Sequence, residues 1–191
     1  MALSVAGVAV LTVTAGLLAS LLAVATLASY LLLYTPLKRI TPLCTLVGAA
    51  PGAAPPLIGW AAARGHLDPE AWLLFSIVFF WQFPHFVAIA WIYRDDYERA
   101  GYVVLPGSAS RELFITVQTL LPLLGLVLVS VLLVHGNQRA VCSIGALLLG
   151  AGFLHFGVRF AMMKTRSAAR QLLMVSILYL PALLLLMSLG A

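Results

Sequence analysis

The sequence predicts an all-α protein whose helices cross a membrane several times. Of its 191 residues, 63% are hydrophobic and only 9% are charged, and the mean hydropathy is +1.08. Soluble domains contain about 25% charged residues, so a water-soluble globule is excluded. The apolar residues form runs of about 20, the length of a membrane-spanning helix, and short polar or Gly/Pro-rich breaks separate the runs. The fold class is therefore a polytopic transmembrane helix bundle.

Seven apolar segments make up this bundle, which we interpret as one domain over residues 1–191 with six to seven spans. The first segment is too short to cross a bilayer comfortably. Either it joins the second in one tilted helix that is broken near Gly16, or it is the remainder of a span whose beginning is missing. The segments cover about 1–13, 16–34, 42–63, 71–93, 113–134, 140–162 and 171–189.

The third segment, "TPLCTLVGAAPGAAPPLIGW", contains several prolines and glycines, which remove backbone donors and permit close approach. A broken helix inside a membrane is tolerated only where it is packed in protein or lines a cavity. The segment is therefore either a packing face of small residues with proline kinks or a cavity wall. The residues concerned are Pro51, Pro55, Pro56, Gly48, Gly52 and Gly59.

The basic residues are distributed asymmetrically over the loops between these segments. If the loop at 35–41 is cytoplasmic, alternation places 94–112 and 163–170 on the same side, and these three loops hold eight of the 11 basic residues. Cytoplasmic loops are enriched in Lys and Arg. The formal charge of +5 gives no indication of nucleic-acid binding, because the basic residues lie between apolar runs rather than in one patch.

The fourth segment ends in a cluster of charges within "FFWQFPHFVAIAWIYRDDYERAGY" (79–102), where Asp95, Asp96 and Glu98 accompany Arg94 and Arg99. Carboxylate oxygens are ligands that Mg²⁺ prefers. The alternative is a solvated helix end with ion pairs such as Asp95–Arg99 at i,i+4 spacing. Both readings stay open on spacing alone.

Three polar residues are predicted to share one face of this helix, because Asp96 follows His85 by eleven positions and Gln82 precedes it by three. His85 is either a satisfied core histidine, a contact to a porphyrin or a proton-transfer group. Lys38 and Arg39 are either membrane anchors or a cationic clamp for phosphate. Cys44 and Cys142 lie in apolar stretches without metal-ligand spacing and are read as buried hydrophobic residues.

The blocks "YTPLKRITPLCTLVGAAPGAAPPLIGW" and "WQFPHFVAIAWIYRDDYERAGYVVLP" resemble the haem O synthase (protoheme IX farnesyltransferase) family of UbiA-type intramembrane prenyltransferases. The resemblance runs from about residue 14 to the C-terminus. It implies a multi-pass protein of the bacterial inner membrane, with a central cavity that opens to the cytoplasm. The implied reaction joins the farnesyl group of farnesyl diphosphate to the vinyl group of haem B and yields haem O, the precursor of haem A. The implied cofactor is Mg²⁺, the lipid bilayer surrounds the bundle, and haem A synthase is a further partner to consider.

Carried over residue by residue, Asp95 and Asp96 match the second acidic motif of that family, which implies catalytic metal ligands. Lys38 and Arg39 match a basic pair near the diphosphate, to which Arg94 is added. His85 falls on the family's histidine in the "PHF" stretch, which implies haem contact or proton handling.

The sequence also departs from the family pattern. It lacks the first acidic motif, an Asn followed by spaced aspartates, and Cys44 stands where an asparagine is expected. We therefore expect the chain to be the C-terminal two-thirds of the enzyme and to be inactive in isolation. The alternatives are another intramembrane prenyltransferase, acting on a quinone or tetrapyrrole, and a catalytically inactive membrane scaffold.

Overall fold

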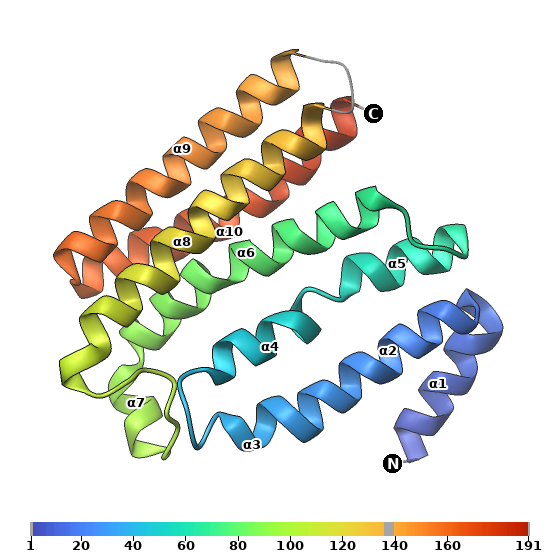
Figure 1. The fold of residues 1–191 in the computed structure, drawn as a ribbon, viewed down its shortest axis with the longest axis horizontal. Coiled ribbons are helices and arrows are strands. Elements are labelled where there is room, and N and C mark those ends of the chain that lie inside the picture. Colours follow the sequence, from blue (N-terminus) through green and yellow to red (C-terminus); the bar gives the residue numbers. More distant parts are fainter. Residues whose placement is uncertain (1, 136–139, 191) are drawn as a thin grey trace.

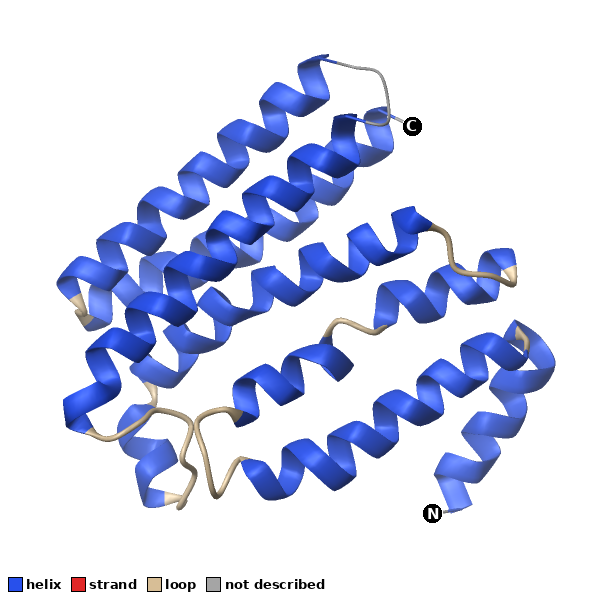
Figure 2. Ribbon diagram, in the orientation of Figure 1, coloured by secondary structure: helices blue, strands red, loops and turns tan. Residues whose placement is uncertain are grey.

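The computed structural model describes residues 2–135 and 140–190, and every regular element in that part of the chain is a helix (Figures 1 and 2). Six helical segments are long and apolar enough to cross a membrane, which confirms the predicted multi-span helical bundle. They are Leu17–Leu37, Cys44–Arg64, Pro69–Ile92, Ala109–Leu132, Cys142–Met163 and Arg166–Ser188.

The N-terminal helix α1 (Ala2–Ala15) folds back against α2 (Leu17–Ser29), as Figure 1 shows. Gly16 joins them with a φ of 88°, a left-handed conformation that glycine adopts without steric cost. The Thr12 hydroxyl donates to Ser20 Oγ across the pair at 2.8 Å. The break near Gly16 is confirmed, and of the two interpretations of the first segment the single tilted helix is wrong, because the chain reverses its direction there.

The second span continues from α2 through a π-helical turn, η1 (Tyr30–Tyr34), into the short α3 (Thr35–Leu37). The third span is broken into α4 (Cys44–Gly52) and α5 (Pro55–Arg64). Prolines open the second piece, where the missing N–H groups would have no intrahelical partner. The predicted interruption of this span is thus confirmed.

The helix α6 (Pro69–Ile92) contacts the broken span on one side and α8 (Ser108–His135) and α10 (Arg166–Gly190) on the other. The helix α9 (Ala140–Met163) packs on α8 and α10. Both α8 and α10 begin about five residues before the predicted apolar segments, because their first turns are polar. The buried core of this half includes Ile77, Ile115, Leu123, Phe153, Phe160 and Leu172.

The three basic loops lie together at one end of the bundle, beside the short helix α7 (Arg94–Arg99) (Figure 1). The Val103 N–H donates to the Lys38 carbonyl at 2.9 Å, which joins the first loop to the second. Lys164 Nζ lies 3.3 Å from Glu112 Oε2, which joins the second to the third. Their predicted placement on one side is confirmed, whereas the division into domains stays a prediction.

Candidate active site

A cavity of about 230 Å³ lies between η1, α4, α6 and α7. Aromatic and small side chains form most of its wall, and a few polar groups converge on it, as is typical of small-molecule sites. Burial raises the pKa of the phenol of Tyr97, one of the lining residues, so this group stays a neutral hydroxyl at physiological pH. The lining includes Tyr30, Tyr34, Cys44, Gln82, Phe86 and Tyr97.

The broken span approaches its neighbours closely along this cavity. A Cβ atom at Gly48 would lie 2.6 Å from Tyr34 Cδ2, and one at Gly52 would collide with Gln82 Oε1. Gln82 is buried, and its Nε2 donates to the Ala49 carbonyl at 2.7 Å. Gly48 and Gly52 pack closely and also line the cavity, so the structure supports both interpretations of this segment.

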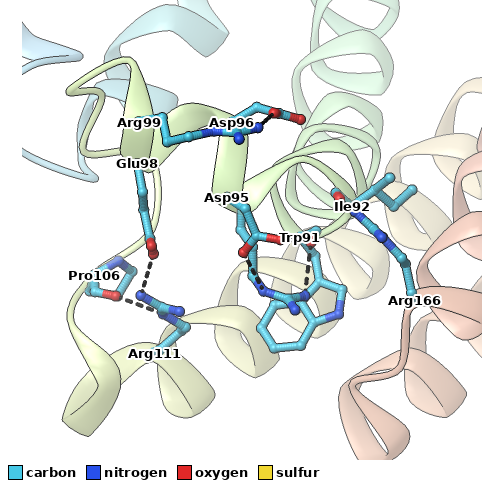
Figure 3. A network of polar contacts seen from close by, with 10 residues as sticks. Trp91, Ile92, Asp95, Asp96, Glu98, Arg99, Pro106, Arg111 and Arg166 are labelled. Carbon is cyan, nitrogen blue, oxygen red and sulfur yellow. Dashed lines mark hydrogen bonds and ion pairs between the residues drawn. The ribbon is translucent and has the colours of Figure 1, made fainter.

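The acidic residues belong to α7, which is separate from α6. The α6 helix ends at Ile92, and Tyr93 (φ −106°, ψ 22°) redirects the chain. Asp95 Oδ1 lies 3.4 Å from Arg94 Nε, and Asp96 forms an ion pair with Arg99, so the two carboxylates turn toward different arginines (Figure 3). The expected Asp95–Arg99 pair is wrong, because Arg99 meets the carboxylate three positions back.

The loop that follows α7, residues 100–107, is a strap held at both ends. Arg111 Nε donates to the Pro106 carbonyl at 3.0 Å, and its Nη2 lies 2.9 Å from Glu98 Oε1 (Figure 3). Glu98 thus fixes the strap through Arg111, which forms no ion pair with either aspartate among the described residues. At its middle, the strap is bonded to Lys38 through the Val103 N–H.

Lys38 and Arg39 lie against the aromatic ring of Tyr102 in the strap. Lys38 Nζ is 4.9 Å from the ring centroid and Arg39 Cζ is 5.9 Å from it, within the range of cation–π attraction. The Tyr102 ring in turn lies 6.3 Å from that of Tyr97 on α7. Among residues 2–135 and 140–190, no ion pair involves either cation. The structure thus brings the basic pair to the acidic helix and leaves it without a carboxylate partner in the described chain.

Gln82, His85 and Asp96 do not form the predicted polar face. Gln82 bonds to α4, whereas His85 Nδ1 lies 2.8 Å from Ser176 Oγ on α10. A spacing of three residues separates the two side chains by about 60° around a helix, and different neighbours meet each. Asp96 lies beyond the break at Tyr93, so the helical projection from His85 does not reach it.

The binding of Mg²⁺ by Asp95 and Asp96 stays a prediction, because each carboxylate pairs with a different arginine in the structure. Within the described residues, no group of three or more His, Cys, Asp and Glu side chains could hold a metal. Mg²⁺, however, usually takes one or two carboxylates and completes its shell with water and phosphate. The Asp95 and Asp96 side chains are 63% and 58% exposed, and exposed ion pairs contribute little stability, so both carboxylates can turn toward a hydrated ion.

The UbiA prenyltransferase family model matches residues 1–187. The chain belongs to the UbiA prenyltransferase family. Family membership agrees with the multi-span helical fold. No solved structure matches the chain significantly.

Curated members of the family are similar to the chain over most of its length. It is 49% identical over 186 residues to "Protoheme IX farnesyltransferase" of Solibacter usitatus. This match covers 94% of the present chain and 62% of the relative. The corresponding Koribacter versatilis protein is 44% identical, over 90% of this chain and 58% of the relative. The human "Protoheme IX farnesyltransferase, mitochondrial" is 40% identical over 96% of this chain and 41% of the relative. The chain thus spans about three fifths of the two bacterial relatives.

Sequence reasoning missed three residues that organise this site. Tyr102 contacts the basic pair, Ser176 bonds to His85, and Arg166 donates to the Ile92 carbonyl at 2.9 Å. Ser176 is a hydroxyl inside an apolar span, which is a weak signal of a polar partner on another helix. Tyr102 and Arg166 give no such signal, because their roles depend on how the loops meet.

Proposed function

We propose that this UbiA-family protein is a protoheme IX farnesyltransferase that joins the farnesyl group of farnesyl diphosphate to a vinyl group of haem B and forms haem O. The observation that carries the proposal is the contact of Lys38 and Arg39 with Tyr102, in the strap that follows α7, next to a cavity that Tyr97 of α7 lines. The names of the similar proteins supply the two substrates.

The substrates require the kinds of group that this end of the bundle offers. A departing diphosphate needs cations, and Lys38 and Arg39 have no carboxylate partner in the described chain, so they are available to it. An allylic cation must be kept from water, and the mostly aromatic and aliphatic wall of the cavity offers it an apolar site. Arg94 is the third candidate for the diphosphate, although its guanidinium now stacks on Trp91 at 4.9 Å.

Asp95 and Asp96 are the residues that would hold Mg²⁺, and the ion, when bound, would neutralise charge on the departing diphosphate. They lie on α7, directly before the strap whose Val103 N–H donates to the Lys38 carbonyl. His85, on the α10 side of α6, is the candidate for haem contact or proton handling.

We place the protein in the bacterial inner membrane with this end of the bundle in the cytoplasm. The support for this orientation is the gathering of eight of the 11 basic residues in the loops at that end.

Exchange of Asp96 for Asn in the longest product of the gene tests the reaction. The assay measures haem O formed from haem B, farnesyl diphosphate and Mg²⁺ in isolated membranes. We expect Asp96→Asn to lower the rate at least about 100-fold, since it removes a charge that holds the metal. Glu112→Gln, which removes an exposed carboxylate paired with Lys164 at the same end, should leave the rate unchanged.

Equal rates in the two variants would refute the assignment of Asp96. Prenylation of a quinone precursor in place of haem B would show a different transferase. Absence of any prenyl transfer by the unaltered protein would favour the scaffold. The 191-residue chain, assayed alongside, tests the expectation that it is inactive alone.

A further inference from the structure

Three hydrogen bonds converge on Ser176, a fully buried residue of α10 that faces the middle of α6. Trp81 Nε1 donates to the Ser176 carbonyl at 2.7 Å. His85 Nδ1 lies 2.8 Å from Ser176 Oγ. The same Oγ donates to the Leu173 carbonyl, one turn earlier, at 2.6 Å. Ser176 therefore contacts two consecutive turns of α6 through both its backbone and its side chain.

The direction of these bonds fixes where the His85 proton lies. A carbonyl oxygen can only accept, so the single hydroxyl proton of Ser176 points at Leu173. Ser176 Oγ must then accept from the imidazole, which places a proton on Nδ1 of His85. In the neutral ring, Nε2 consequently carries the free lone pair. In the part of the chain that the structure describes, Nδ1 is the only nitrogen of this ring with a hydrogen bond.

Trp81 fixes the plane of the same ring. Its indole stacks on the imidazole with centroids 4.7 Å apart and an angle of 24° between the planes. The indole is itself held by its bond to the Ser176 carbonyl. Histidines that bind metals commonly donate their second N–H to an oxygen, which sets both tautomer and orientation. In the Trp81–His85–Ser176 arrangement, His85 likewise donates one ring N–H to an oxygen, that of Ser176.

We propose that Ser176 is a positioning residue, which holds His85 with Nδ1 protonated and Nε2 presented as a proton acceptor or as a ligand to iron. The tautomer follows from the hydrogen bonds alone. The use of Nε2 toward haem rests on the proposed function.

Imidazole ¹⁵N NMR of the full-length protein in nanodiscs tests the tautomer directly. The chain has four histidines, and the His85 signal is the one that His85→Gln removes. We expect the Nδ1–H tautomer in the unaltered protein and in Ser176→Thr, which keeps a hydroxyl. Ser176→Ala should give a mixture of tautomers. Ser130→Ala removes another buried hydroxyl, which contacts Leu126 and Tyr179, and should leave the His85 signal as it is.

An Nε2–H tautomer in the unaltered protein, or an unchanged signal in Ser176→Ala, would overturn the proposal. Haem O assays of the same variants test the role. We expect a 10- to 100-fold loss in kcat for Ser176→Ala, in the range known for residues that orient a ligand histidine, and near-normal turnover for Ser176→Thr. A changed tautomer with full turnover would overturn the positioning role. If no variant makes haem O, the proposed function fails, and the NMR result still decides the tautomer.

Discussion

Gly157 of α9 shows how a missing side chain sets a helix contact at the scale of the single residue. A Cβ atom at this position would collide with Leu123 Cδ1 of α8, and Leu123 is fully buried. The Thr119 methyl group lies 3.5 Å from the same point. The two helices can therefore approach closely only because residue 157 is glycine, as at small-residue contacts of membrane helices.

We predict that Gly157→Ala destabilises the protein by about 1–3 kcal/mol, because Leu123 must leave its rotamer in a close-packed core. Gly152→Ala is the matched control, since a Cβ atom there meets nothing within 4 Å on the same helix. It should be neutral or stabilise by up to about 1 kcal/mol, through the lower flexibility of alanine. Unfolding in mixed detergent micelles measures both, and equal effects would contradict the packing argument.

The end of α6 shows how an element is terminated by a contact from far along the chain. In a continuous helix the Ile92 carbonyl would accept from the Asp96 N–H, but that N–H donates to the Tyr93 carbonyl instead. Arg166 supplies the missing donors, with Nη2 at 2.9 Å and Nε at 3.3 Å from the Ile92 oxygen (Figure 3). The first turn of α10 thus stabilises the break that separates α7 from α6.

We predict that Arg166→Gln loosens this junction at a cost of about 1–2 kcal/mol, because a freed carbonyl loses two charge-assisted bonds. Hydrogen exchange should rise at residues 93–99 and stay unchanged in α1, which packs on α2. Arg170→Gln removes an exposed arginine from the next turn of α10 and should alter neither segment. Equal protection of 93–99 in both variants would refute the role of Arg166.

The elements themselves could largely be predicted from the sequence, whereas their interruptions could be predicted only in part. Apolar length gave the spans, and prolines gave the break between α4 and α5. No proline or glycine marks the break at Tyr93 in the sequence. This break depends on a contact with Arg166, far along the chain, so it could not be predicted. The sequence indicated Asp95, Asp96, Arg94 and Arg99 together, but the pairing expected for Arg99 was wrong, because Asp96 and not Asp95 contacts it.

At the scale of the whole molecule, the distribution of basic residues along the chain predicted which ends of the helices lie on the same side of the membrane. Lys38, Arg111 and Lys164 gather at one end of the bundle, as the alternation of spans requires. The placement of Gln82 and His85 toward different helices could not be predicted in this way, because it depends on which helices flank α6. The charge of a loop indicates on which side of the membrane the loop lies. It does not indicate which helices pack against each other inside the membrane.

Membrane topology provides the test at this scale. Cys44 and Cys142 are both buried, as predicted, and their exchange for Ala leaves a background for single reporter cysteines. We place one reporter at Ser167, an exposed residue in the first turn of α10 at the basic end, and one at His66, an exposed residue between α5 and α6. Ser167→Cys should react with an impermeant thiol reagent only in inverted vesicles, and His66→Cys only in right-side-out ones. Labelling of both reporters from the same side would contradict the alternation of spans. The reverse pattern would place the basic end of the bundle outside the cytoplasm, which would contradict the orientation inferred from the basic loops.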